Sequence, residues 1–224
     1  MTVSSRRPRP STPMPTVRVP STLWAVGTEA LDPDDRWPAP VLVHTIREFS
    51  TPGSRVMLIG WPAPTGRGAL RMIEPDTAHA LAAIRDLDRH SLDTPTHPSH
   101  PGEPVDLVIA SLLADHVDPI RAAEHITALA TEVMAMGGLL VVLSRCRHSH
   151  SGILLDPAGS VVSAAQAADL LYLQHIIAAP VTSHTITAPA PAPAPAPAEQ
   201  TAPGVPQHRV AHTDVLVFLQ PEHG

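Results

Sequence analysis

The sequence predicts one α/β domain, a doubly wound three-layer sandwich built around a mostly parallel sheet. Short, mostly apolar runs occur at 55–60, 105–110 and 139–144, and such runs are typical of strands that are covered on both faces. Segments with helical periodicity alternate with these runs, which favours a parallel sheet flanked by helices. The 224 residues, 43% of them hydrophobic, are enough to form one such domain.

Four helices are predicted from the spacing of apolar residues and from start and stop signals. They span 40–49, 76–87, 118–136 and 161–171. The first ends at a Ser-Thr-Pro-Gly cluster, where a helix cannot easily continue. The third opens with Asp-Pro, since proline suits the first turn of a helix, and it ends at two glycines.

Three further segments are strand candidates, and the connections between them are rich in proline. The candidates are residues 69–73, 172–178 and 215–219, whereas residues 90–104 are predicted to be a loop. The last candidate follows a long connection and is expected to return as an antiparallel hairpin strand. The sheet is therefore expected to be mostly parallel with one antiparallel strand at the C-terminus.

Composition divides the chain into an arm, a domain and an insert. Residues 1–20 hold prolines and arginines without an apolar pattern and are expected to be a disordered arm. Residues 21–221 form the predicted single domain. Within it, a low-complexity Ala/Pro insert at about 180–206 favours an extended conformation that cannot build a core.

Charge and cysteine content narrow the classes of partner. The formal net charge is −6, which argues against strong DNA binding, because contacts of Lys and Arg with phosphate supply most of that affinity. Cys146 is the single cysteine, so no intrachain disulfide can form. No apolar run is long enough to cross a membrane. We therefore expect a cytoplasmic protein without a membrane partner.

Five segments carry a resemblance to a known family. They read IREFSTPGSRV, VDLVIAS, GGLLVVLSR, LLDPAGSVVSAAQAADL and AHTDVLVFLQP. In order and spacing they resemble the bacterial N-4/N-6 DNA methylases, over most of 40–178 and 207–221. The resemblance implies a Rossmann-like methyltransferase sheet, S-adenosylmethionine as the cofactor and DNA as a partner.

The cofactor loop of that family is altered in this chain. The family has a loop of the type D-P-x-x-G-x-G-T after its first strand, where glycines let the backbone approach the ligand. Here Trp-Pro-Ala-Pro follows Gly60, and the prolines remove two backbone donors. The resemblance implies that Gly60, Gly66, Gly68 and Glu74 are the cofactor-binding candidates. Glu74 is the expected acid at the end of the second strand, which would bind the ribose hydroxyls.

The connection between the first two predicted strands is unusually short. Only residues 61–68 separate Gly60 from the strand candidate at 69–73, whereas a parallel crossover normally takes about a dozen residues or more. We infer that the helix lining the cofactor site is deleted, or that these two strands pair differently.

The catalytic motif of the family is also altered. Its pattern is Ser, Asp or Asn followed by Pro-Pro and an aromatic residue, which hold the target amino group and stack on the flipped-out base. The corresponding residues here are Ser111-Leu112-Leu113-Ala114. Ser111 is thus the single catalytic candidate, and both prolines and the aromatic residue are missing.

Two polar clusters contain residue types that can bind metal ions. The first holds Cys146, His148 and His150, and the second holds Asp115, His116 and Asp118. Neither cluster contains a C-x-x-C pair or an evident fourth ligand of the kind that structural zinc requires. We therefore predict no metal site.

The sequence thus predicts a degenerate S-adenosylmethionine-dependent DNA methyltransferase-like protein without catalytic activity. Binding of S-adenosylmethionine is doubtful because of the altered loop, and no protein partner can be named. One alternative is an active DNA N4-cytosine or N6-adenine methyltransferase with divergent motifs. The other is a small-molecule or metal-binding module.

Overall fold

The computed structural model describes residues 22–61, 77–93, 103–114, 118–148, 153–187 and 211–222. Its centre is a seven-stranded sheet in the order β1-β8-β11-β5-β4-β2-β3. These strands are β1 (Leu23–Ala25), β2 (Arg55–Ile59), β3 (His90–Asp93), β4 (Val105–Ser111), β5 (Met134–Ser144), β8 (Leu171–Ala179) and β11 (Thr213–Leu219). β11 runs antiparallel to its neighbours β5 and β8, and the other pairs of this sheet are parallel. The predicted Rossmann-like sheet with an antiparallel C-terminal strand is confirmed.

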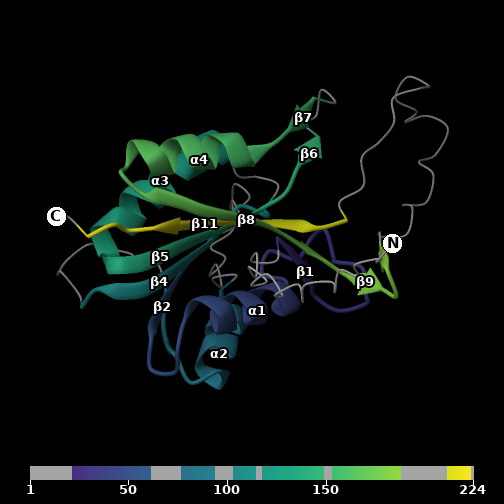
Figure 1. Ribbon diagram of the computed structural model, residues 1–224, viewed down its shortest axis with the longest axis horizontal. Helices are drawn as coiled ribbons and strands as arrows, with labels where there is room; N and C mark the ends of the chain where they lie inside the picture. Colours follow the sequence, from purple (N-terminus) through teal and green to yellow (C-terminus); the bar gives the residue numbers. More distant parts are fainter. Residues whose placement is uncertain are drawn as a thin grey trace, which may run out of the picture.

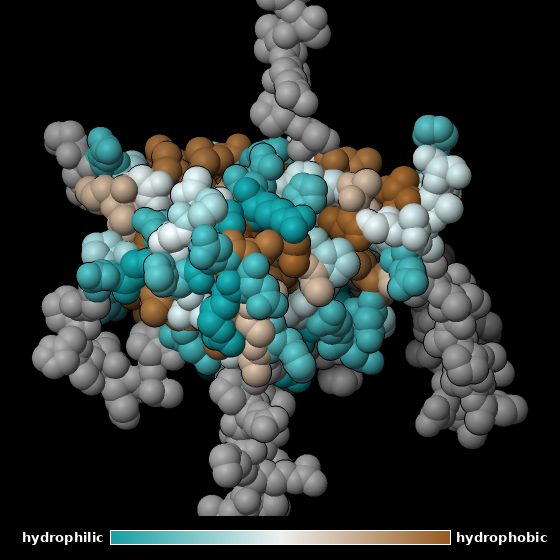
Figure 2. Space-filling view, turned by 90° about the horizontal axis from the view of Figure 1, so that it is seen from below, coloured by the Kyte–Doolittle hydropathy of each residue, from teal (hydrophilic) through white to brown (hydrophobic). Residues whose placement is uncertain are grey.

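Helices cover both faces of this sheet. Figure 1 shows α1 (Ala39–Phe49) and α2 (Ala78–Asp86) below the sheet, and α3 (Pro119–Val133) and α4 (Pro157–Ala167) above it. In Figure 2, which looks at the molecule from below, hydrophilic side chains occupy most of the centre of the face. Helices that turn polar residues outward and apolar residues toward the sheet are what the helical periodicity predicts. The three predicted layers are present.

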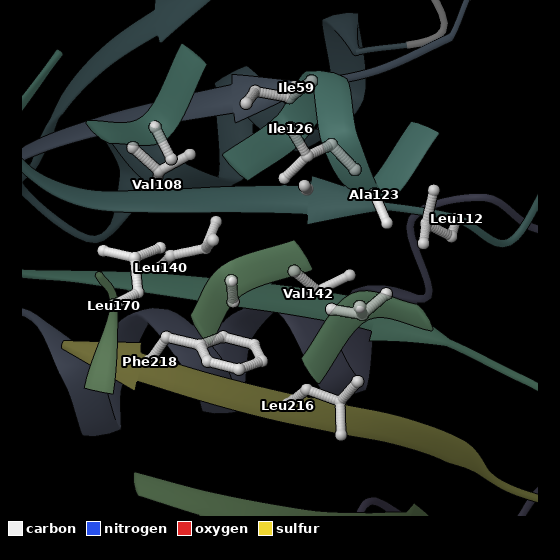
Figure 3. Close-up of a cluster of buried hydrophobic side chains, with 14 of the residues drawn as sticks. Ile59, Val108, Leu112, Ala123, Ile126, Leu140, Val142, Leu170, Leu216 and Phe218 are labelled. Carbon is white, nitrogen blue, oxygen red and sulfur yellow. The ribbon is translucent and has the colours of Figure 1, made fainter. Parts of the chain in front are cut away.

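The core consists of one apolar cluster on each face of the sheet. Val142, Leu216 and Phe218 belong to the upper cluster, which α3 and α4 cover (Figure 3). Leu58 and Val215 belong to the lower cluster, which α1 and α2 cover. All five side chains are at most 1% exposed. Because successive residues of a strand point to opposite faces, β11 contributes to both clusters.

The strand beside β2 differs from the one that the sequence predicted. β3 pairs with β2 in parallel, and α2 lies between them along the chain. A helix is therefore present in this crossover, so the inferred deletion is wrong. The predicted loop at 90–104 is wrong over its first four residues, 90–93. The strand candidate at 69–73 lies outside the described residues.

Two helices have boundaries that differ from the predicted ones. α4 begins at Pro157 rather than 161 because the side chain of Asp156 accepts a hydrogen bond from the Ala158 N–H at 2.9 Å. α4 ends at Ala167, two residues before Asp169, whose φ of 60° is left-handed. α3 ends at Val133 rather than 136 because β5 has already begun.

Two short hairpins lie outside the main sheet. β6 (Arg147–His148) pairs with β7 (Leu154–Leu155), and β9 (Val181–Thr182) pairs with β10 (Thr185–Ile186). The second hairpin falls within the predicted Ala/Pro insert, so that region begins with regular structure. The arm at 1–20 and residues 188–210 lie outside the described residues. In the ranges that the structure describes, no helix is both long and apolar enough to cross a membrane.

Candidate functional site

The predicted site lies where β2 and β4 end, at the carboxyl edge of the sheet. These strands are neighbours, with Ile59 opposite Ala110. Gly60 and Ser111 follow these two residues, so the structure brings both predicted site residues to adjacent strand ends. In folds of this class, ligands bind at this edge. The other predicted site residues, Gly66, Gly68 and Glu74, lie outside the described residues.

The Ser111 hydroxyl is hydrogen-bonded within the protein and is not open to a ligand. Its side chain is buried, and its residue is 3% exposed. Its Oγ donates to the carbonyl oxygen of Arg36 at 2.6 Å and accepts from the Leu113 N–H at 3.4 Å. The hydroxyl therefore ties the segment before α1 to the end of β4. A ligand would have to displace this contact to reach it.

The residues that replace the Pro-Pro-aromatic motif are buried too. Leu112, Leu113 and Ala114 are at most 5% exposed. The carbonyl oxygen of Leu113 accepts from the Arg145 guanidinium at 2.7 Å, and that of Ala114 accepts from Arg147 at 2.8 Å. The backbone acceptors that follow Ser111 are thus already engaged by charged donors, and such bonds are among the stronger ones in proteins.

Trp61 fills the space at the end of β2. Its side chain packs against the upper core cluster, with its ring centroid 5.6 Å from that of His125 on α3. Its carbonyl oxygen lies 3.4 Å from a guanidinium nitrogen of Arg36. Its indole Nε1 is buried and has no hydrogen-bond partner among the described residues. A packed indole stands where a glycine-rich loop would leave room for the methionine part of the cofactor.

Asp93 is a site residue that sequence reasoning missed. It ends β3, opposite Leu58 of β2, and its Oδ2 accepts from the Thr77 hydroxyl at 3.1 Å. In Rossmann-like folds an acid at the end of the second strand binds ribose hydroxyls, and here Asp93 holds that position in the sheet. The sequence prediction names Glu74, at the end of the strand candidate 69–73, and both lie outside the described residues.

The structure describes Cys146 and His148 of the first candidate metal cluster and Asp118 of the second. Asp118 caps α3, where its side chain accepts from the N–H groups of Ile120 and Arg121. Burial raises the pKa of the Cys146 thiol, and the negative charges of Asp156 and Asp214 raise it further. Such a thiol stays protonated and is a poor nucleophile. The described residues do not include His150, Asp115 or His116. Among the residues that are described, no group of three potential ligands could hold a metal ion.

Another polar cluster, which the sequence did not predict, joins β8 and β11. Oδ1 of Asp214 lies 2.8 Å from Nε2 of His175 and 3.5 Å from Nε2 of His212. Burial alone would raise the pKa of Asp214, but the hydrogen bonds from the two imidazoles outweigh it and lower the pKa. We call these three residues the Asp214 clasp. Because His175 and Asp214 are 39 residues apart in sequence, only the strand register could have revealed their contact.

A groove of about 570 Å³ lies between α3 and α4, away from the strand ends. Small side chains line most of it, including Thr127, Ala128, Ser163 and Ala164. Its residues come only from the two helices, and none of them is a predicted site residue. The groove therefore adds nothing to the chemistry at the carboxyl edge.

Comparisons with known proteins give distant similarities to solved structures and no match in sequence. No protein-family model and no curated protein matches this chain. Among solved structures it is similar to a Haloferax volcanii methyltransferase in complex with the activator Trm112, at 16% identity and a TM-score of 0.45, over 81% of this chain and 88% of that one. A methyltransferase from Methanosarcina mazei gives 9% identity and a TM-score of 0.42, over 80% and 97% of the two chains.

A DNA modification methylase from Thermus thermophilus is also similar, at 13% identity and a TM-score of 0.39, over 76% of this chain and 54% of that one. At such identities and TM-scores, neither an activity nor a substrate follows from the similarity. The chain has a methyltransferase-like α/β fold.

Proposed function

We propose that this chain is a degenerate S-adenosylmethionine-dependent DNA methyltransferase-like protein that does not catalyse methyl transfer. The observation that carries the proposal is the state of the residues after β4. Ser111 is buried and bonded to the Arg36 carbonyl, and the carbonyl oxygens of Leu113 and Ala114 accept from Arg145 and Arg147. The groups that would hold a target amine are engaged within the protein.

Methylation of an amino group needs more than a nearby cofactor. The amine must meet hydrogen-bond acceptors, and a base taken out of the duplex loses stacking energy of a few kcal/mol that the protein must offset. The Ser111 hydroxyl keeps acceptor lone pairs while it donates to the Arg36 carbonyl, but Ser111 is 3% exposed, so a target amine could reach it only if the surrounding packing opened. Ala114 stands where the family has its stacking aromatic residue and is itself 5% exposed. The described edge therefore lacks both requirements.

The described residues do not fit the cofactor well either. S-adenosylmethionine would supply the methyl group, and its methionine part would need open backbone at the end of β2. Trp61 packs there instead, against the core and His125. Asp93 is placed to bind a ribose hydroxyl, but its side chain is engaged with Thr77. We therefore propose no reaction step through this cofactor.

The family resemblance is the argument for DNA as a partner. The net charge of −6 argues against strong DNA binding. The rival function is an active DNA N4-cytosine or N6-adenine methyltransferase, which would need Ser111 to contact the target amine. No observation on the described residues favours that rival. None favours a metal-binding module, because no group of potential ligands could hold an ion there.

Methyl transfer to DNA tests the proposal directly. Purified protein is incubated with S-adenosylmethionine labelled on its methyl group and with duplex and single-stranded DNA, and incorporation into DNA is measured. We expect no incorporation above a protein-free control. Incorporation that Ser111→Ala abolishes, in a variant that remains folded by circular dichroism, would establish the rival instead.

Calorimetric titration with S-adenosylmethionine and S-adenosylhomocysteine tests cofactor binding separately. We expect no heat of specific binding. Micromolar binding that is weakened in Asp93→Asn would show that a ribose site persists, and the proposal would then keep its non-catalytic part only. Glu103→Gln, an exposed acid elsewhere on the surface, is the matched control.

A further inference from the structure

The Asp214 clasp lies at the beginning of the antiparallel strand. Asp214 is the second residue of β11, which lies between β5 and β8 (Figure 1). It precedes Leu216 by two residues, so its side chain lies on the upper face. That side chain is 7% exposed, whereas those of His175 and His212 are each 39% exposed. A buried carboxylate therefore meets two imidazoles that remain open to solvent protons.

The two contacts of the clasp, His175 with Asp214 and His212 with Asp214, differ in how much they depend on the charge of the imidazole. Nε2 of His175 lies 2.8 Å from Oδ1, which is hydrogen-bonding distance. An ionised carboxylate can only accept, so this nitrogen donates its hydrogen whether or not the ring is charged. Nε2 of His212 lies at 3.5 Å, a longer contact that becomes stronger when the imidazole is charged. The His175 contact is thus the shorter of the two, and the His212 contact is strengthened by a proton.

No other described side chain beside Asp214 takes the place of the two imidazoles. Ser144 stands directly opposite Asp214 on β5, yet its hydroxyl is buried without a partner among the described residues. The other titratable groups nearby are Cys146 after β5 and Asp156 at the start of α4. The thiol is neutral because its pKa is raised, and Asp156 bears the same charge sign as Asp214. The two imidazoles are therefore the cationic partners that the described residues give Asp214.

We propose that the Asp214 clasp is a proton-dependent device that fixes the beginning of β11 when His212 is protonated and loosens it when His212 is neutral. His212 stands immediately before β11, so its contact with Asp214 restrains the first residues of that strand. The His175 bond keeps Asp214 attached to β8 in both states. The change is therefore local to the entry of β11, and the rest of the sheet keeps its pairing.

The direction of the pH effect follows from the charges. The Asp214 carboxylate raises the pKa of His212 above its ordinary 6.5, against the opposing effect of burial. A group whose pKa is raised by folding stabilises the folded state fully below the unfolded pKa, and this contribution is lost as pH rises through the folded pKa. The beginning of β11 is thus most stable in weakly acidic solution, and this stabilisation is lost as pH rises through the raised pKa of His212.

Amide hydrogen exchange of the full chain tests the device. Exchange is measured between pH 5.5 and 8.5 and corrected for the intrinsic pH dependence of chemical exchange. We expect the protection of the Thr213 to Val215 amides to fall by roughly two- to fivefold as pH rises, the size of a partly exposed ion pair. The amides of β4 from Leu107 to Ile109 are the internal reference and should not follow this change.

Variants decide between the clasp and a general pH effect. His212→Gln should remove the pH response of β11, and Asp214→Asn should remove it as well. His184→Gln deletes an exposed imidazole in the turn between β9 and β10 and should behave like the wild type. A wild-type response that persists in His212→Gln, or one that β4 shares equally, overturns the proposal. So does the absence of any response in the wild type.

Discussion

At the scale of single residues, Ser111, the predicted catalytic candidate, makes a contact that supports the fold. Its Oγ donates to the Arg36 carbonyl at 2.6 Å inside the protein. Ser111→Ala removes this bond and leaves a carbonyl without that donor. We expect the free energy of unfolding to fall by about 1–3 kcal/mol, as measured by urea denaturation. A structural serine thus has a stability cost on removal that a solvent-exposed catalytic serine would lack.

The matched control is Ser163→Ala on the exposed side of α4. It removes the same hydroxyl from a solvent-exposed helical position, where substitutions usually change stability by no more than about 0.5 kcal/mol. Equal stability of wild type and Ser111→Ala would show that the Arg36 contact contributes nothing, and the structural role of Ser111 would have to be abandoned.

Gly138 is a second residue whose environment fixes its identity. A Cβ at this position would lie 2.8 Å from the Ala135 carbonyl oxygen and 3.1 Å from that of Val105. Backbone cannot yield as a flexible side chain can, so Gly138→Ala should destabilise the protein by about 1–3 kcal/mol. Thermal unfolding followed by circular dichroism measures this effect.

Gly159→Ala supplies the comparison for Gly138→Ala. Gly159 lies in α4, and nothing stands within 4 Å of a Cβ built there. Alanine is favoured over glycine in helices by up to about 1 kcal/mol, so this substitution should be neutral or stabilising. If both glycine variants lose the same stability, the close approach at Gly138 is not the cause.

At the scale of elements, strands with a strong apolar signal were predicted and those without one were missed. β5 and β11 are almost continuous runs of Leu and Val, because both of their faces are covered. Among the described strands, β3 lies at the edge of the sheet and pairs with β2 alone, and its sequence His-Ser-Leu-Asp has one strongly apolar residue. The sequence therefore did not indicate Asp93 as a candidate, and Glu74, the predicted ribose-binding acid, lies outside the described residues.

The start of α3 was predicted correctly because its signal is local. Asp118 accepts hydrogen bonds from the N–H groups of Ile120 and Arg121, and Pro119 occupies the first turn. Asp118→Ala should lower the free energy of unfolding by about 1 kcal/mol, measured by chemical denaturation. Glu132→Ala on the exposed side of the same helix should leave it nearly unchanged, and a larger loss there would contradict the assignment of the effect to the cap.

At the scale of the whole molecule, the contacts that decide function join residues that are far apart in sequence. Ser111 meets Arg36 because the fold brings the segment before α1 to the end of β4, and Asp214 meets His175 because β11 pairs with β8. Composition and periodicity predict the layers, since these depend on local pattern. They do not predict which buried polar groups pair, since that depends on register across the sheet.

The Asp214 clasp also sets how the whole fold responds to acid. Interactions with His212 and His175 hold the pKa of Asp214 below its ordinary 3.8, although burial opposes them. A carboxyl whose pKa is lowered by folding stabilises the folded state above the unfolded pKa, and that contribution is lost as pH falls through the folded pKa. Stability should therefore decline below about pH 4 as Asp214 takes up a proton, on top of any general effect of other carboxyls.

Asp214→Asn isolates this contribution because asparagine keeps the shape and cannot ionise. At neutral pH we expect the variant to be less stable by about 2 kcal/mol, as is typical of a buried hydrogen bond to a charged group. Its thermal midpoint should approach that of the wild type as pH falls from 5 to 3, because protonation costs the wild type the same interaction. If the thermal midpoints of the two proteins changed in parallel with pH, Asp214 would not titrate as the clasp requires. The loss of stability in acid would then come from other groups.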